Sequence, residues 1–133
     1  MYYAEAFCFN VGAISFIYDN NISLDGEWTS LSNDIVISGS EAKFSEIKSG
    51  MWADGLSQGF IKENDLRLKN ITKTGDYEWT CSVRAGNYDE SQRIVTSVYW
   101  VDNCTLVLVP DEKTFTVKGV VPNASGDGEK ELF

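Results

Sequence analysis

Apolar and polar residues alternate along most of this chain, in short runs separated by turn-forming residues. Between Tyr77 and Arg84 every second residue is apolar, and the residues between them are polar or charged. A repeat of two residues places the two sets on opposite faces of a β-strand, one dry and one wet. This pattern, with β-branched and aromatic runs, predicts strands at Ala4–Phe9, Ala13–Tyr18, Gly26–Ser30, Asp34–Ser38, Ala42–Ile47, Gly59–Lys62, Leu66–Ile71, Tyr77–Arg84, Arg93–Val101, Thr105–Val109 and Thr114–Lys118.

Short connections join these predicted strands. Gly39-Ser40, Lys73–Asp76 and Pro110–Lys113 carry the glycine, aspartate and proline residues that favour tight turns. Asp102-Asn103 predicts a further tight reversal, and Ala85–Gln92 predicts a polar hairpin loop. Because a parallel pair needs a crossover of roughly a dozen residues or more, connections this short predict antiparallel neighbours.

Helical signals are weak throughout the chain. The best candidate is Ser49–Gln58, where glycine interrupts the apolar spacing, so we expect one helical turn or an ordered loop there. The last residues, 123–133, combine glycine with acidic residues and predict a flexible acidic tail.

Length and pattern together predict one all-β domain over residues 1–122. A chain of 133 residues fits a single domain and can bury a core without disulfide or metal staples. A meander of short strands must protect its edges, and closing the sheet on itself does so completely. We therefore expect a small antiparallel up-and-down barrel, with a β-sandwich as the alternative.

Net charge and hydropathy limit the kinds of partner that we expect for this protein. The 20 acidic and 11 basic residues give a net charge of −9, and the basic residues are scattered. Such a surface repels phosphate backbones, so we expect no nucleic-acid partner. Apolar runs such as Leu106–Val109 are too short to span a bilayer, which predicts no transmembrane segment. The N-terminus lacks a signal-peptide pattern. The sequence does not determine the compartment, and the periplasm or secretion are options if a leader was removed. It does not determine the oligomeric state either.

Three cysteines, Cys8, Cys81 and Cys104, are too few and too unevenly spaced for a disulfide scaffold or a zinc site. One interpretation is three reduced, mostly buried thiols. The alternative pairs Cys81 with Cys104 across neighbouring strands and leaves Cys8 free.

The absence of histidine excludes several kinds of chemistry. Ser-His and Cys-His nucleophile systems are impossible, as are histidine-ligated metal sites. We expect no catalytic residues, no metal site and no cofactor. A carboxylate-based hydrolase stays open as an alternative, because glycoside hydrolysis needs only two carboxylates, but no spacing singles out a pair.

Aromatic residues are the best candidates for ligand binding. We select Trp28, Trp52, Trp79, Tyr99 and Trp100 as ligand-binding residues. Trp28 and Trp79 lie in strand patterns where a place in the core is the competing interpretation. Trp52 lies in a loop pattern, where it would either plug the mouth of a barrel or contact a partner.

Asp25-Gly26-Glu27-Trp28 resembles the Gly-x-Trp signature of lipocalins and of short bacterial lipocalin-like proteins. In that family the tryptophan opens the first barrel strand and closes the bottom of the barrel, and the other strands follow in up-and-down order. The resemblance covers Gly26 to about Lys118. It implies a barrel with a cavity for a small ligand.

Three functional hypotheses follow. The first is a non-enzymatic binding module that holds a small apolar ligand in a barrel cavity. The second is a protein- or glycan-interaction domain that uses an acidic outer face with Trp52, Tyr88 and Trp100 as anchors. The third is the carboxylate-based enzyme, which requires two acidic residues with divergent pKa values in one cleft.

Overall fold

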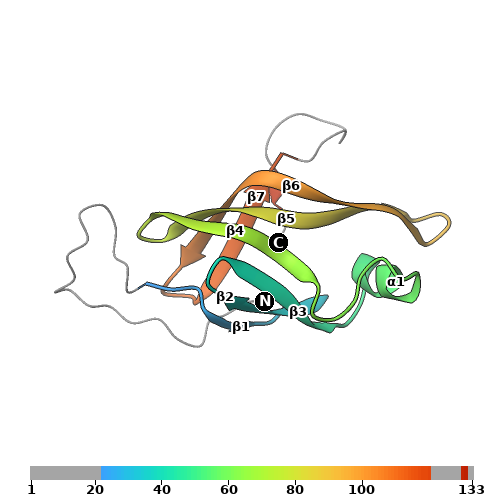
Figure 1. Ribbon diagram of the computed structural model, residues 1–133, viewed down its shortest axis with the longest axis horizontal. Helices are drawn as coiled ribbons and strands as arrows, with labels where there is room; N and C mark the ends of the chain where they lie inside the picture. Colours follow the sequence, from blue (N-terminus) through green and yellow to red (C-terminus); the bar gives the residue numbers. More distant parts are fainter. Residues whose placement is uncertain (1–21, 121–129, 132–133) are drawn as a thin grey trace.

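The computed structural model describes residues 22–120 and 130–131. Their strands form one antiparallel sheet in which each strand pairs with its neighbour in the sequence (Figure 1). The elements are β1 (Gly26–Trp28), β2 (Asn33–Ser38), β3 (Glu41–Ile47), α1 (Met51–Ser57), β4 (Leu66–Gly75), β5 (Glu78–Asp89), β6 (Ile94–Val109), β7 (Thr114–Gly119) and β8 (Lys130–Glu131). The prediction of an all-β, antiparallel, up-and-down fold is confirmed.

The sheet curls into a half-barrel (Figure 1). Side chains from its two ends meet inside the curl, where Trp28 of β1 packs edge-to-face on Phe115 of β7 with 4.4 Å between ring centroids. Trp28 is fully buried, and its Nε1 donates a hydrogen bond of 2.8 Å to the Leu24 carbonyl oxygen. Since the described strands all belong to one sheet, they do not form the alternative, a two-sheet sandwich.

The main core fills the concave face of the sheet. In β2, Ile35 and Ile37 are buried while Val36 between them is exposed, and β6 repeats this alternation at its C-terminal end. Burial of one such side chain contributes about 1.5–3 kcal/mol, so the alternation determines which face turns inward. The curl around Trp28 is therefore packed with side chains.

The longest strands, β5 and β6, form an arm that extends beyond the rest of the sheet (Figure 1). The prediction of a loop over Ala85–Gln92 is wrong for most of that range, because β5 continues to Asp89 and pairs with β6 throughout. Polar residues are compatible with a strand here because an arm that projects from the sheet exposes much of its surface to water.

The predicted reversal at Asp102-Asn103 is also wrong. Asn103 adopts a left-handed φ of 57° inside β6, where the pairing with β5 shifts. Asparagine tolerates this conformation, and a bulge of this kind bends a strand without ending it. Arg93–Val101 and Thr105–Val109, predicted as two strands, therefore belong to one continuous strand, apart from Arg93 itself.

Gly59–Lys62, predicted as a strand, instead leads the chain away from α1. Gly59 has a φ of 83°, in the left-handed region where helices commonly end. The backbone N–H groups of Phe60 and Ile61 both donate to the Gly55 carbonyl oxygen, at 2.8 and 3.2 Å. These donors cap the helix and are not available to a strand. The helix itself, Met51–Ser57, is longer than the single turn expected from the sequence.

The remaining predictions concern turns and termini. Gly39-Ser40 and Pro110–Lys113 form the expected turns, whereas the β4–β5 turn lies at Asp76-Tyr77, slightly later than predicted. The strands expected at Ala4–Phe9 and Ala13–Tyr18 lie outside the described residues. Within 123–133, the range of the predicted tail, only β8 is described, and it pairs with β7.

Candidate functional site

The helix α1 lies against the sheet where the β5–β6 arm leaves the half-barrel. Gly55 allows this close approach, because a Cβ atom at that position would lie 3.2 Å from Ile61 Cγ1 and 3.7 Å from Val95 Cγ2. On the arm, Tyr88 donates a hydrogen bond to the carboxylate of Asp54 in α1, and this bond raises the pKa of Tyr88. Small-residue packing and a polar contact together hold the helix on the arm.

A pocket of about 210 Å³ lies between α1 and the inner face of the sheet, and we call it the α1 pocket. Four elements supply its walls: Met51 and Trp52 from α1, Arg67 from β4, Val83, Ala85 and Gly86 from β5, and Tyr99 from β6. A Cβ atom at Gly86 would lie 3.2 Å from Met51 Sδ and 3.0 Å from the Ser97 carbonyl oxygen. Glycine at this position therefore makes room for the Met51 side chain.

Arg67 is the charged residue of the α1 pocket, and it is only 4% exposed. A bulge explains its orientation: Ala42 pairs with Leu68 and Lys43 with Leu66, so Arg67 is the extra residue and turns inward beside Leu68. Its guanidinium carbon lies 4.5 Å from the centroid of the Trp52 ring. The guanidinium also donates a hydrogen bond from Nη1 to the Arg84 carbonyl oxygen.

The structure brings two of the predicted ligand-binding residues, Trp52 and Tyr99, into this pocket. Trp52 is 6% exposed and packs on Phe44 of β3, with 5.4 Å between ring centroids. Of the two alternatives for Trp52, its burial argues against an anchor for a partner on the outer face. The residue lies in α1 and not in the loop that the sequence predicted.

The other three predicted residues lie elsewhere. Trp28 is buried in the main core. Trp79 lines a separate pocket of about 240 Å³ near Ile22 and Leu24. Trp100 lies partly buried on the outer face, where Lys69 Nζ is 4.2 Å from its ring centroid. The five predicted residues therefore do not form one site.

Sequence reasoning missed Arg67, Met51 and Gly86. Strict alternation across Leu66–Ile71 assigns Arg67 to the face opposite Leu66 and Leu68, and the bulge that changes this assignment has no signal in the residue pattern. Met51 and Gly86 become wall residues only because α1 rests on the arm.

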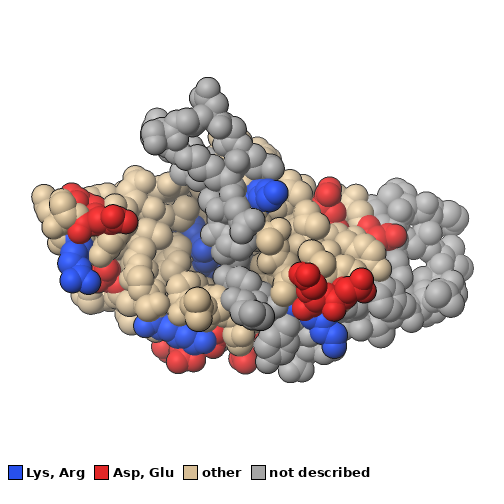
Figure 2. All heavy atoms as spheres, turned by 180° about the vertical axis from the view of Figure 1, so that it is seen from behind, with Lys and Arg blue, Asp and Glu red and all other residues tan. Residues whose placement is uncertain are grey.

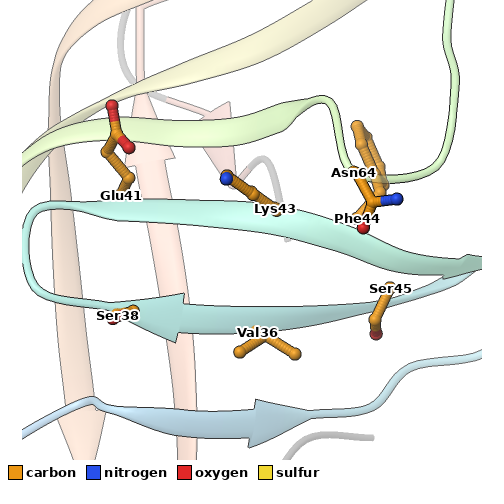
Figure 3. Close-up of a pocket in the computed structure, with 7 residues that line it drawn as sticks. All are labelled: Val36, Ser38, Glu41, Lys43, Phe44, Ser45 and Asn64. Carbon is orange, nitrogen blue, oxygen red and sulfur yellow. The ribbon is translucent and has the colours of Figure 1, made fainter.

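A larger pocket, of about 410 Å³, lies on the outer face of the β2–β3 hairpin (Figure 3). Its lining combines Val36, Ser38, Glu41, Lys43, Phe44, Ser45 and Asn64. Its charged groups, Glu41 and Lys43, are both exposed, and water screens exposed charges strongly. The α1 pocket, with a buried cation and aromatic walls, is the better candidate for specific recognition.

A polar groove of about 500 Å³ follows the outer face of β4, β5 and β6. It is lined by Asn70, Thr72, Thr80, Cys81, Ser82, Asp102 and Asn103. The Ser82 hydroxyl donates a hydrogen bond of 2.7 Å to Asp102 Oδ1 and orients that carboxylate. Asn70 and Asn103 both have a left-handed φ of 57°, at irregularities on either side of β5.

Cys81 and Cys104 lie directly opposite each other in β5 and β6, as the alternative interpretation of the cysteines predicted. Both thiols are buried, and no disulfide joins them. Burial raises the pKa of Cys81 to about 12; the neighbouring Cys104 adds to this rise, and the positive charge of Arg67 opposes it. At neutral pH Cys81 is therefore a protonated core residue and a poor nucleophile. Cys8 lies outside the described residues.

Neither a metal-binding cluster nor a membrane-spanning helix is present in residues 22–120 and 130–131. No three acidic or cysteine side chains in these ranges are grouped closely enough to hold a metal ion. No helix in the same ranges has the length and hydropathy needed to cross a membrane. On the face in Figure 2, Lys and Arg side chains lie apart with acidic side chains among them, and the absence of a nucleic-acid partner stays a prediction.

Comparison with known proteins gives no relative. No protein-family model matches the chain, and no curated protein or solved structure matches it. The resemblance to lipocalins, based on Gly26-Glu27-Trp28, therefore stays a prediction.

Proposed function

We propose that this protein is a non-enzymatic binding module that holds a small, mostly apolar ligand in the α1 pocket. The observation that carries this proposal is the aromatic and thioether wall formed by Trp52, Tyr99 and Met51 around a pocket of about 210 Å³. Recognition pockets are typically apolar concavities with a few well-placed polar groups. Arg67 is such a group here.

The dimensions of the α1 pocket limit its ligand. Pockets for drug-sized molecules span roughly 300–1,000 Å³, so this one suits a smaller molecule, such as one substituted six-membered ring. Flat rings gain from contact with aromatic faces and with the polarizable methionine sulfur. The curl around Trp28 is filled by core side chains, so the proposed ligand occupies the α1 end and not a cavity along the whole half-barrel.

Binding of 4-methylphenol, a small aromatic that is neutral at pH 7, tests the proposal. Saturation-transfer NMR and calorimetry on the full chain measure its affinity, and native mass spectrometry detects any copurified ligand. Ala85→Leu fills the pocket from its β5 wall. We expect this variant to weaken binding at least tenfold, which corresponds to about 1.4 kcal/mol.

Ala53→Leu is the matched control, because it makes the same change on α1 outside the pocket lining. We expect Ala53→Leu to bind as the wild type does. Circular dichroism establishes that both variants fold. Unchanged affinity in folded Ala85→Leu, or no binding by the wild type, would contradict the proposal.

A second candidate function, glycan binding, is favoured by the polar groove on the outer face. Its amides, hydroxyls and oriented Asp102 carboxylate can pair with sugar hydroxyl groups. Trp100 lies two residues before Asp102 on the same strand and offers an aromatic surface nearby. We expect Asp102→Asn to weaken binding of cellohexaose or maltohexaose at least tenfold. The control Asp111→Asn, in an exposed turn, should leave binding unchanged. Absence of binding to both sugars would reject this candidate.

A further inference from the structure

We propose that the outer face of β4, β5 and β6 recognises glycans that carry a carboxylate, and that Lys69 and Arg84 bind this group beside Trp100. The inference rests on the second candidate function, glycan binding, because it names the substrate class for the polar groove. Lys69 Nζ lies 4.2 Å from the centroid of the Trp100 ring, and the Arg84 guanidinium carbon lies 5.9 Å from it. We call these three residues the cationic cluster.

Strand register places the cationic cluster at one end of the polar groove. Lys69 of β4 lies directly opposite Ser82 of β5, which lines the groove. Arg84 follows two residues later on β5 and therefore shares the face of Ser82. It lies directly opposite Trp100 of β6. A sugar chain that follows the groove thus reaches both cations at this end.

Acidic side chains do not neutralise the cationic cluster. Neither Lys69 nor Arg84 forms an ion pair with an acidic residue within 22–120 and 130–131. Asp102, the acidic residue in the groove lining, is instead oriented by the Ser82 hydroxyl. Two cations around one indole therefore create a local positive potential that attracts a ligand carboxylate.

The contacts of the two cations prepare them for binding. Lys69, Arg84 and Trp100 are all partly buried. The indole contacts both cationic groups, and Arg84 Nη2 also donates a hydrogen bond of 3.5 Å to the Phe60 carbonyl oxygen. These contacts limit the movement of both side chains, so less conformational entropy is lost on binding. Surface charges without such contacts are screened more strongly by water.

Net charge and groove chemistry specify the rest of the ligand. The chain carries a net charge of −9, so the protein as a whole repels a long polyanion even where one carboxylate is attracted. The groove offers the amides of Asn70 and Asn103 and the hydroxyls of Thr72 and Thr80, which can pair with sugar hydroxyl groups. A neutral sugar chain that bears one uronic acid meets both conditions.

The decisive experiment compares aldotriouronic acid, a xylobiose that carries one glucuronate, with its methyl ester, which has nearly the same shape and no charge. Calorimetry on the full chain at pH 7 measures both affinities for the wild type, Lys69→Gln and Arg84→Gln. We expect the wild type to bind the acid at least fivefold more tightly than the ester, and each variant to lose most of this preference. Added salt should weaken binding of the acid and not of the ester, because ions screen the charges.

Lys113→Gln is the matched control, because it removes the same charge in the exposed turn between β6 and β7. We expect this variant to keep the preference of the wild type. Circular dichroism establishes that all variants fold. If a variant of the cationic cluster does not fold, the wild-type comparison and its salt dependence decide the matter.

Each other outcome has a distinct meaning. Equal affinity for the acid and the ester would reject the carboxylate inference and leave the glycan candidate standing, as would a preference that survives in both folded variants. If the wild type binds neither, the inference is rejected, and cellohexaose and maltohexaose decide whether glycan binding itself fails. A blocked tripeptide with one glutamate side chain that binds as tightly as the acid would show recognition of charge alone and would also reject the inference.

Discussion

Replacement of Trp28 by phenylalanine tests whether the two ends of the sheet meet inside the curl. The indole of Trp28 is fully buried and donates to the Leu24 carbonyl oxygen, in a part of the chain that is itself buried. Loss of this donor leaves a buried carbonyl unsatisfied, at a cost of about 1–3 kcal/mol. The smaller ring also removes buried apolar atoms, worth about 1 kcal/mol. We therefore expect Trp28→Phe to lower the free energy of unfolding by about 2–4 kcal/mol.

Trp100→Phe is the matched control, since Trp100 lies partly exposed on the outer face. For this variant we expect a loss below about 1 kcal/mol. Urea unfolding followed by far-UV circular dichroism measures the free energy of unfolding of both tryptophan variants. Unchanged m-values would show that each variant exposes the same surface on unfolding as the wild type. A double-mutant cycle of Trp28→Leu and Phe115→Leu, in which each substitution removes one ring, should give a coupling of about 0.5–1.5 kcal/mol for the ring contact. Equal losses for the two tryptophan variants would refute the placement of Trp28 in the core.

Three further predictions concern titration and reactivity. The hydrogen bond to Asp34 raises the pKa of Lys48 above 10.5. The pair therefore stabilises the fold fully below pH 10.5 and loses its effect as the pH rises through the folded-state pKa of Lys48. Asp34→Asn should lower the Lys48 pKa in an NMR titration. The Ser91 hydroxyl, 2.7 Å from Asp89 Oδ1, lowers the pKa of Asp89 below 3.8. Its effect is therefore present above 3.8 and is lost as the pH falls through the lower folded-state value; Ser91→Ala should raise the Asp89 pKa, and no change would contradict the assignment. Because burial raises the pKa of Cys81 to about 12, iodoacetamide at pH 8 should alkylate Cys81 in urea but only slowly in the native protein, as peptide mapping by mass spectrometry would show.

The alternation of apolar and polar residues was sufficient to predict most of the sheet. Within the predicted strands Tyr77–Arg84 and Thr114–Lys118, all residues except Tyr77 lie in strands with the expected buried face, because a repeat of two residues has only one way to bury its apolar set. The prediction of strand ends failed where a strand continues through residues typical of turns. Asn103 is one such residue: in isolation it predicts a reversal, but in the sheet it forms a bulge between Val101 and Cys104, which both pair with β5.

The candidate site was less predictable than the fold. Trp52 and Tyr99, selected from the sequence as large aromatic residues, both line the α1 pocket, whereas the other three selected residues do not. Arg67 was missed because one extra residue in β4 reverses the face on which it lies. Nothing in the identity of the residues around Arg67 shows which strand carries the bulge, since that depends on the register with β3.

The sequence by itself determined the all-β class, the antiparallel order and the identity of the inward-facing residues in most strands. These properties follow from local causes, namely the two-residue repeat of a strand, turn residues at short intervals and the transfer of apolar side chains from water. Only the tertiary structure decided that α1 rests on the β5–β6 arm, that Arg67 turns inward and that Trp28 meets Phe115. These contacts join residues far apart in the chain, so they depend on strand register and on the curl of the whole sheet, which no local pattern encodes.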